Sequence, residues 1–282
     1  MSFELARKYA PHVDELFRSE SKISLLTNSN YDWTGAHSVM VYKFNTAPMN
    51  DYVRNKTLAE TPEQSISRFG KILDLEAQTE ELLLKKDRSF IFNIDKLDQD
   101  ETNDALKAAT ALARQIREEV IPEVDTYVYT AMATGAGTKA SPAALTGENV
   151  YSAIIAGSEA LDNAEVPDTE RVLVVSPATY RAMKSAKEID LSMDVPQELR
   201  SLGVIGIVDG MMVVKVPAVR LPENFGFMLA HPSATVAPVK LEDYGTHPNT
   251  VLSSGTIVTG RIAYDAFVLA NKKTGIYYHP VL

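Results

Sequence analysis

The feature that most constrains the fold of this chain is a run of apolar residues at helical spacing. The run alternates steps of three and four residues over about seven turns, which indicates one long amphipathic helix. A helix of about 30 residues spans about 45 Å, which is longer than a small domain is wide. The apolar positions are Leu106, Ala109, Ala113, Ile116, Val120, Val124, Tyr127 and Ala131.

The residues around this run predict where the helix begins and ends. Asp98, with Glu101 three positions later, forms a capping-box pattern at its start. The glycines among residues 134–137 predict its end. Pro122 lies inside the run, so we expect it to kink the helix or to end one segment of it.

Four carboxylates crowd this helix: Glu118, Glu119, Glu123 and Asp125. Such a cluster can perform acid/base chemistry, hold a metal, or form the solvated side of a helix. Glu119 and Glu123 are expected opposite the apolar stripe, and Glu118 follows Arg114 by one helical turn, a weakly stabilising pair. We therefore interpret the cluster as a solvated helix face without a catalytic role.

Composition narrows the class of protein. The 282 residues are 45% hydrophobic, enough for a large core in one large or two modest domains. No apolar run reaches the roughly 18 residues of a membrane helix, and the charged N-terminus predicts no signal peptide. The absence of cysteine excludes disulfides and thiolate metal sites and fits a reducing cytoplasm. A net charge of −9 argues against strong nucleic-acid binding through a basic surface.

The N-terminal third predicts extended parts. Residues 37–44 and 88–95 alternate like strands, and residues 45–87 between them form a long protruding loop, expected as an extended hairpin with its tip near residues 57–70. Residues 1–35 are interrupted by Pro11 and rich in turn residues, so we expect an arm that packs on another chain. Its apolar side chains are Leu16, Phe17, Ile23, Leu25, Leu26 and Trp33.

The second half indicates an α/β layered unit. A helix containing Val150 to Leu161 precedes a buried strand, residues 171–175, and a second helix. Ser176 suits the N-cap of that helix, and Pro177 suits its first position. Asp209-Gly210 joins two β-branched runs in a hairpin. One strand is expected in residues 225–245 and two more near the C-terminus.

No motif predicts an active site. Residues 135–141, "GAGTKAS", follow a helix and therefore lack the context of a phosphate-binding loop. Ser176 lacks the Gly-x-Ser-x-Gly pattern of a hydrolase nucleophile, and the five histidines are not spaced as metal ligands. We predict no catalytic, cofactor-binding or metal-binding residues.

Several phrases come in a recognisable order along the chain: "SVMVYKF", "DRSFIFNIDKLDQDET", "IREEVIPEVDTYVY", "RVLVVSPATYRAM", "IGIVDGMMVVKVP", "FMLAHPSATVAPVKLEDY" and "GRIAYDAFVLANKKTGIYY". Together with the arm and the long loop, this order resembles the major capsid proteins of tailed bacteriophages over nearly the whole chain. The resemblance implies an α+β fold of the Hong Kong 97 type, with residues 1–37 as N-arm and 38–94 as E-loop with flanking strands. It further implies a peripheral-domain spine helix in residues 95–139, an axial domain in 140–255, and peripheral-domain strands in 256–282.

The same resemblance implies a shell subunit that forms pentamers and hexamers of an icosahedral head around double-stranded DNA. We expect a separate scaffolding protein, a portal and decoration proteins as partners, and assembly in the host cytoplasm. Some relatives form a lysine–asparagine cross-link; Lys56, Lys71 and Asn271 are candidates, but we predict that none forms. Two alternatives remain open, an encapsulin-like nanocompartment that holds protein cargo, and an α/β enzyme using Ser176 or residues 118–125.

Overall fold

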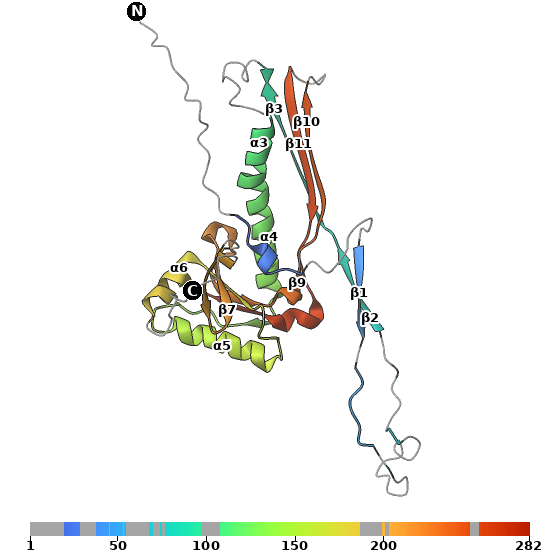
Figure 1. The fold of residues 1–282 in the computed structure, drawn as a ribbon, viewed down its shortest axis with the longest axis vertical. Coiled ribbons are helices and arrows are strands. Elements are labelled where there is room, and N and C mark those ends of the chain that lie inside the picture. Colours follow the sequence, from blue (N-terminus) through green and yellow to red (C-terminus); the bar gives the residue numbers. More distant parts are fainter. Residues whose placement is uncertain are drawn as a thin grey trace, which may run out of the picture. The chain divides into compact units, whose positions relative to one another are not determined.

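A computed structural model gives the structure of the protein (Figure 1). The contacts divide the chain into two compact units, Gly35–Leu84 and the remainder, and each is described by itself. The structure describes residues 20–28, 38–44, 46–52, 54, 68–69, 74, 77–96, 108–186, 199–200, 203–248 and 254–282.

The smaller unit contains an antiparallel pair of strands. Strand β1 (Ser38–Phe44) pairs with β2 (Ala77–Leu83) along its full length. This pairing confirms the expected strand and the hairpin form of the loop that follows it. Most of the expected tip, residues 57–70, lies outside the described residues. In the described part, the rings of Tyr52 and Phe69 meet edge to face with centroids 5.1 Å apart.

The long helix predicted from the apolar run is present and ends where expected. It consists of α3 (Ala108–Gln115), a π-helical turn η3 (Ile116–Val120) and α4 (Ile121–Gly135). In the π turn the Ile121 N–H donates to the Ile116 carbonyl, five residues back. This wider turn comes directly before Pro122, and it gives room to a ring that would clash with the carbonyl of an ordinary α-turn. The helix therefore continues past the proline. The proposed capping box, Asp98 and Glu101, lies outside the described residues.

A three-stranded antiparallel sheet lies alongside α3 (Figure 1). Its order is β10 (Val239–Pro248), β11 (Gly255–Tyr264) and β3 (Lys86–Asp95). The ring of Phe90 stacks with those of Phe92 and Tyr244, each at a centroid distance of 6.2 Å. Gly260 pairs with Phe90 across the strands, and a Cβ at that position would lie 2.3 Å from the Phe90 ring. The glycine is therefore needed for this aromatic row.

The larger unit also contains a six-stranded mixed sheet. Its order is β4 (Thr138–Lys139), β13 (Ile276–Pro280), β8 (Phe225–Ala230), β5 (Val172–Val175), β7 (Met211–Lys215) and β6 (Val204–Val208). In β5, Val172 and Val174 belong to one apolar cluster, while Leu173 and Val175 belong to another. Both faces of the sheet are therefore covered, as layered α/β packing requires.

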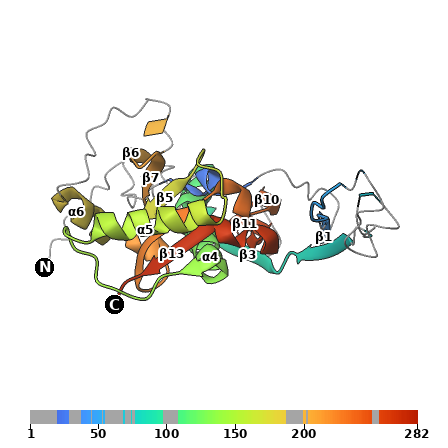
Figure 2. The same ribbon diagram turned by 90° about the horizontal axis from the view of Figure 1, so that it is seen from below.

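The two faces are covered by different elements. The first cluster joins the sheet to α4 and to residues 23–26. The second joins it to α5 (Val150–Asn163) and α6 (Pro177–Ser185). Figure 2 shows α5 running across the strands of this sheet. The expected α/β layered unit is thus confirmed.

Two local predictions in this unit are also confirmed. The Ser176 side chain accepts the Thr179 N–H at the start of α6, and Pro177 takes the first helical position. The β6–β7 turn holds Asp209 at φ 50° and Gly210 at φ 74°, the left-handed pair that suits a tight hairpin.

The C-terminal third contains more strands than the sequence predicts, and they belong to different sheets. Residues 225–245 contain β8, the short β9 (Thr235–Val236) and the start of β10, and β10 joins the three-stranded sheet. After β11 come β12 (Phe267–Val268), which pairs with β9, and the 3-10 helix η6 (Ala270–Gly275). Residues 256–282 consequently contribute to three sheets. The domain boundaries inferred from the sequence remain a prediction.

The prediction that the N-terminal arm packs only on another chain is wrong for residues 20–28. Leu26 is fully buried, and Ile23 and Leu25 pack against the same core cluster of their own chain. The 3-10 turn η1 (Ile23–Leu25) covers apolar surface that the sheet and α4 leave open. An apolar pattern cannot tell a contact within the chain from one between chains. Leu16, Phe17 and Trp33 lie outside the described residues.

Leu26→Ala should lower the free energy of unfolding by about 2–5 kcal/mol, because it empties a fully buried site in the core. Leu282→Ala is the matched control, since that leucine is 85% exposed and its truncation should change little. Urea denaturation of both variants measures the difference. Equal, small effects would show that residues 20–28 form a detachable arm.

Candidate functional site

The middle of α4 carries a buried ion pair. Asp125 is 2% exposed and accepts a hydrogen bond from the Arg220 Nη1 at 2.6 Å. Its second oxygen accepts the Ser21 hydroxyl, also at 2.6 Å. Arg220 ends the 3-10 turn η4 (Ala218–Arg220) and is itself 4% exposed. One carboxylate therefore joins the spine helix, the N-terminal segment and the loop after β7.

Burial sets the protonation energetics of this pair. Loss of solvent raises the pKa of Asp125 above its ordinary value, and the hydrogen bonds from Ser21 and Arg220 oppose that rise. A pair of this kind positions segments and adds little net stability.

A second contact joins α4 to the three-stranded sheet. The Arg88 Nε of β3 lies 2.6 Å from the Glu123 Oε1, and the Tyr264 hydroxyl of β11 donates to the same oxygen at 3.1 Å. Burial, followed by the nearby charge of Glu123, raises the pKa of Tyr264. Arg88 and Glu123 are both about half exposed, so the ion pair itself adds little.

Asp265 forms a third contact, at the end of β11. It is 3% exposed and accepts hydrogen bonds from the Tyr127 hydroxyl at 2.7 Å, the Lys85 N–H at 2.8 Å and the Ala266 N–H at 2.8 Å. Burial and the hydrogen bond to Asp265 raise the pKa of Tyr127 to about 12. Asp265 thus fixes the start of β3 and the end of β11 to the helix.

These contacts partly correct the solvated-face interpretation. Glu119 is exposed and Glu118 pairs with Arg114 at 3.0 Å, as expected. Glu123 is exposed but faces the sheet, and Asp125 is buried, so the interpretation is wrong for Asp125. The helix is packed on two sides, which a single apolar stripe cannot reveal. A second stripe gives the missed signal, and its members are Asp125, Val128, Tyr129 and Met132.

Ser176, the other candidate nucleophile, is a buried helix cap. It is 6% exposed, and its hydroxyl lies 3.0 Å from that of Thr179, which donates to the Gly226 carbonyl at 2.8 Å. Its hydrogen-bonding capacity is used in joining α6 to β8. The N-cap explanation derived from the sequence holds.

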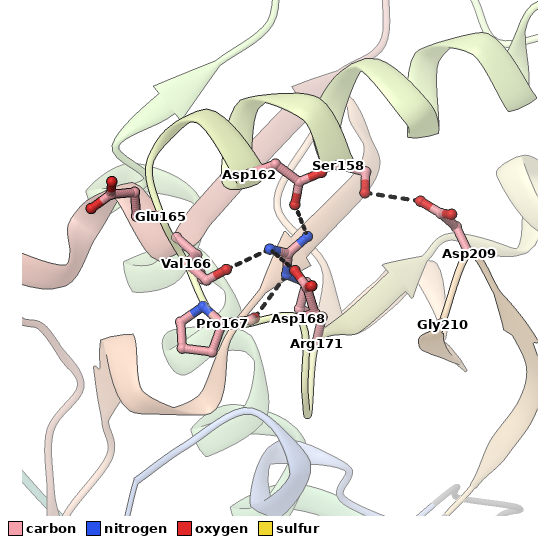
Figure 3. A pocket seen from close by; sticks show the side chains of 9 residues that line it. All are labelled: Ser158, Asp162, Glu165, Val166, Pro167, Asp168, Arg171, Asp209 and Gly210. Carbon is pink, nitrogen blue, oxygen red and sulfur yellow. Dashed lines mark hydrogen bonds and ion pairs between the residues drawn. The ribbon is translucent and has the colours of Figure 1, made fainter.

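An acidic groove of about 590 Å³ lies at the C-terminal end of α5 (Figure 3). Arg171 crosses its floor at 4% exposure and donates to Asp162 at 2.6 Å, to Asp168 at 2.8 Å and to the carbonyls of Val166 and Pro167. Ser158 donates to Asp209 on the opposite wall at 2.9 Å. No periodic sequence pattern predicts this groove, because its lining residues come from a helix end, a loop and a turn. Its lining residues are Ser158, Asp162, Glu165, Val166, Pro167, Asp168, Arg171, Asp209 and Gly210.

Metal binding, membrane spans and the cross-link candidates are considered for the part of the chain that the structure describes. No group of three or more histidine, aspartate or glutamate side chains there is arranged to hold a metal ion. None of the helices found in the same residues combines the length and apolarity of a membrane span. Asn271 lies exposed on η6, whereas Lys56 and Lys71 fall outside the described residues. The absence of a cross-link therefore stays a prediction.

Comparison with known proteins assigns the family. A family model described as "Phage capsid protein" matches residues 81–278. A search of curated proteins finds no match. Among solved structures, one described as Mycobacterium phage Che8 is 17% identical with a TM-score of 0.71, covering 98% of this chain and 96% of that chain. The capsid of cyanophage P-SCSP1u is 13% identical with a TM-score of 0.71, covering 98% and 93%. The mature capsid of bacteriophage PhiM1 is 14% identical with a TM-score of 0.67, covering 98% and 91%.

The chain is matched over nearly its whole length by these structures, and its spine helix packed between two sheets belongs to the Hong Kong 97 fold. The family match covers well over half of the chain, and the chain belongs to the phage capsid protein family. Its role is structural: it is a major capsid protein, and its place is the capsid of the virion.

Asp125→Ala should lower the free energy of unfolding by about 3–5 kcal/mol, because it leaves the buried Arg220 guanidinium without its carboxylate. Arg220→Met is the second single change, and Asp125→Ala combined with Arg220→Met should lose less than the sum of the two single changes. Chemical denaturation of the three variants gives the coupling free energy. The matched control is Asp87→Ala, whose ion pair with Arg261 is exposed, and its effect should be much smaller. If the changes in the free energy of unfolding simply add in the double variant, Asp125 and Arg220 do not stabilise each other.

Alkaline titration tests the Tyr127–Asp265 contact. Unfolded tyrosine ionises near pH 10, whereas the folded state holds Tyr127 protonated to about pH 12, so stability should fall as pH rises between these values. Tyr127→Phe removes one such group and should make the decline shallower. Thermal melts from pH 9 to 12 measure both slopes, and identical slopes would contradict the assignment.

Proposed function

We propose that this chain forms pentamers and hexamers of an icosahedral phage head that encloses double-stranded DNA. The observation that supports the higher assembly is the separate β1–β2 unit, which presents large apolar side chains to water. Met49 is 98% exposed and Phe69 is 77% exposed. Burial of such a side chain contributes about 1.5–3 kcal/mol, which favours contact with a neighbouring copy of the chain.

The charge of the chain suits a container for DNA. At −9, the subunit repels phosphate overall, so it confines packaged DNA and makes no sequence-specific contact with it. A separate scaffolding protein, a portal and decoration proteins are the further partners in this proposal, and assembly takes place in the host cytoplasm. Ser176 and the carboxylates of α4 serve packing in this proposal, and the chain is not an enzyme.

The domain assignment is part of the proposal. The spine helix, which the structure describes from α3 to α4 within the predicted range 95–139, and the sheet of β3, β11 and β10 form the peripheral domain. The six-stranded sheet with α5 and α6 forms the axial domain at the capsomer centre, within residues 140–255 and completed by β13. Residues 1–37 and 38–94 supply the N-arm and the E-loop with its flanking strands.

Particle contents test the proposal. The purified chain, produced alone and with its scaffolding protein, should give closed particles by electron microscopy, and particles made during infection should hold nuclease-protected double-stranded DNA. Particles that instead hold a copurifying enzyme would support the nanocompartment alternative. A chain that stays monomeric under all these conditions would overturn the proposal.

Met49→Asp should block assembly without destabilising the fold, because a 98% exposed side chain contributes little to its own unit. Met49→Leu keeps volume and apolarity and should assemble normally. Sedimentation velocity measures assembly, and thermal melts measure the fold. Normal assembly of Met49→Asp would show that another surface joins the subunits.

A further inference from the structure

Three lysines converge at the edge of the six-stranded sheet where β7 ends. The Lys215 Nζ lies 5.0 Å and the Lys184 Nζ 5.8 Å from the centroid of the Tyr180 ring. The Lys22 Nζ donates to the Lys215 carbonyl at 2.8 Å. Lys184 comes from α6, Lys215 from the end of β7 and Lys22 from the N-terminal segment. We call Lys22, Lys184 and Lys215 the lysine cluster.

The lysine cluster is a positive surface within an acidic protein. Lys184 and Lys215 are exposed, and among the described residues none of the three lysines forms an ion pair. Burial, followed by the positive charges of Lys215 and Arg220, holds the pKa of Lys22 below its ordinary value. The positive charge of Lys215 therefore opposes that of Lys22, and a negative partner would relieve this repulsion.

The acidic groove lies at the opposite end of the same strands. Strands β5 and β7 run parallel, with Val172 beside Met212 at one end and Val175 beside Lys215 at the other. The groove residues Arg171 and Asp209 come just before these strands begin, and the lysine cluster surrounds the point where they end. Four strand residues separate the ends by about 13 Å, so the two charged surfaces face away from each other.

The charge of the groove is complementary to that of the lysine cluster. Its lining holds four carboxylates, Asp162, Glu165, Asp168 and Asp209, against the single guanidinium of Arg171. The carboxylate groups are accessible, since the Asp168 side chain is 90% exposed and that of Asp162 is 56% exposed. Arg171 is already held by the groove itself, so the excess negative charge remains available to a partner.

We propose that the lysine cluster of one subunit docks against the acidic groove of a second copy of this chain, head to tail. The proposal rests on the proposed assembly of the chain into rings. Two different surfaces on opposite ends of one domain define a heterologous contact, which closes into a ring when each copy repeats the same rotation. Opposite charges at such a contact favour the correct orientation and penalise like-charged alternatives.

A second copy fits this surface better than DNA does. The groove supplies a counter-surface that every neighbouring copy necessarily brings, and the proposed assembly requires the chain to associate with itself. DNA binding depends on many phosphate contacts, and the lysine cluster is small in a chain whose net charge is −9. DNA is therefore treated as a competing outcome of the test.

A charge-exchange experiment tests the contact. The full chain carries Lys184→Glu with Lys215→Glu, or Glu165→Lys with Asp168→Lys, or all four changes. Lys86→Glu is the matched control, because Lys86 also lies 5.0 Å from a tyrosine ring centroid, that of Tyr127, but outside the lysine cluster. Sedimentation velocity gives the concentration needed for assembly, circular dichroism and thermal melts report the fold, and fluorescence anisotropy reports binding to a double-stranded DNA oligomer.

Each double variant should raise the concentration needed for assembly by at least about tenfold, because like charges then face each other. The quadruple variant should assemble as the wild type does, since the charges are exchanged and complementary again. Lys86→Glu should also behave as the wild type. Recovery in the quadruple variant excludes misfolding as the cause of the losses.

Three results would overturn the inference while leaving the proposed function intact. The first is normal assembly of both double variants, which would show that the charged surfaces do not meet. The second is normal assembly with lost DNA binding in Lys184→Glu/Lys215→Glu, which would assign the lysine cluster to DNA. A quadruple variant that is folded but fails to assemble would equally contradict the pairing. Failure of the wild type to assemble would instead count against the proposed function.

Discussion

Burial of α4 on two sides is the constraint on which the larger unit depends. One side of the helix meets the three-stranded sheet through Glu123 and Tyr127, and the other meets the six-stranded sheet through Val128, Tyr129 and Met132. A helix in this position must be continuous, because a break would separate the two sheets. The π turn before Pro122 preserves that continuity where proline would otherwise oppose it.

The buried ion pair of Asp125 with Arg220 fixes which segments of the chain lie against α4. A leucine at residue 125 would pack between helix and sheet as well, but it would not select Ser21 and Arg220 as neighbours. The ion pair sets where the N-terminal segment crosses the helix, and that segment brings Lys22 to the end of β7. The contacts of Asp125 thus position residues 20–28. Through Lys22, they also position the lysine cluster at the edge of the six-stranded sheet.

Sequence patterns predicted the long helix, the Ser176 cap and the Asp209-Gly210 turn because each depends on residues close together in the chain. The burial of Leu26 and Asp125 in their own chain could not be predicted in this way. An apolar side chain in an arm is equally consistent with its own core and with a neighbouring subunit, and a carboxylate on a helix is usually solvated. Strand β2, "AQTEELL", lacks apolar alternation and forms through pairing with β1. The acidic groove escaped prediction because Asp162, Asp168 and Asp209 meet only after α5, β5 and the β6–β7 hairpin have packed.

The claim that α4 is the common element of both sheets can be tested by native-state hydrogen exchange on the dissociated subunit. We expect the amides of residues 125–133 to exchange only through global unfolding, with the same free energy as those of β5 and β8. Their protection should fall together in denaturant. Exchange of these α4 amides at a clearly lower free energy than the strands of the six-stranded sheet would contradict this claim, because the helix would then open while the sheet remains folded.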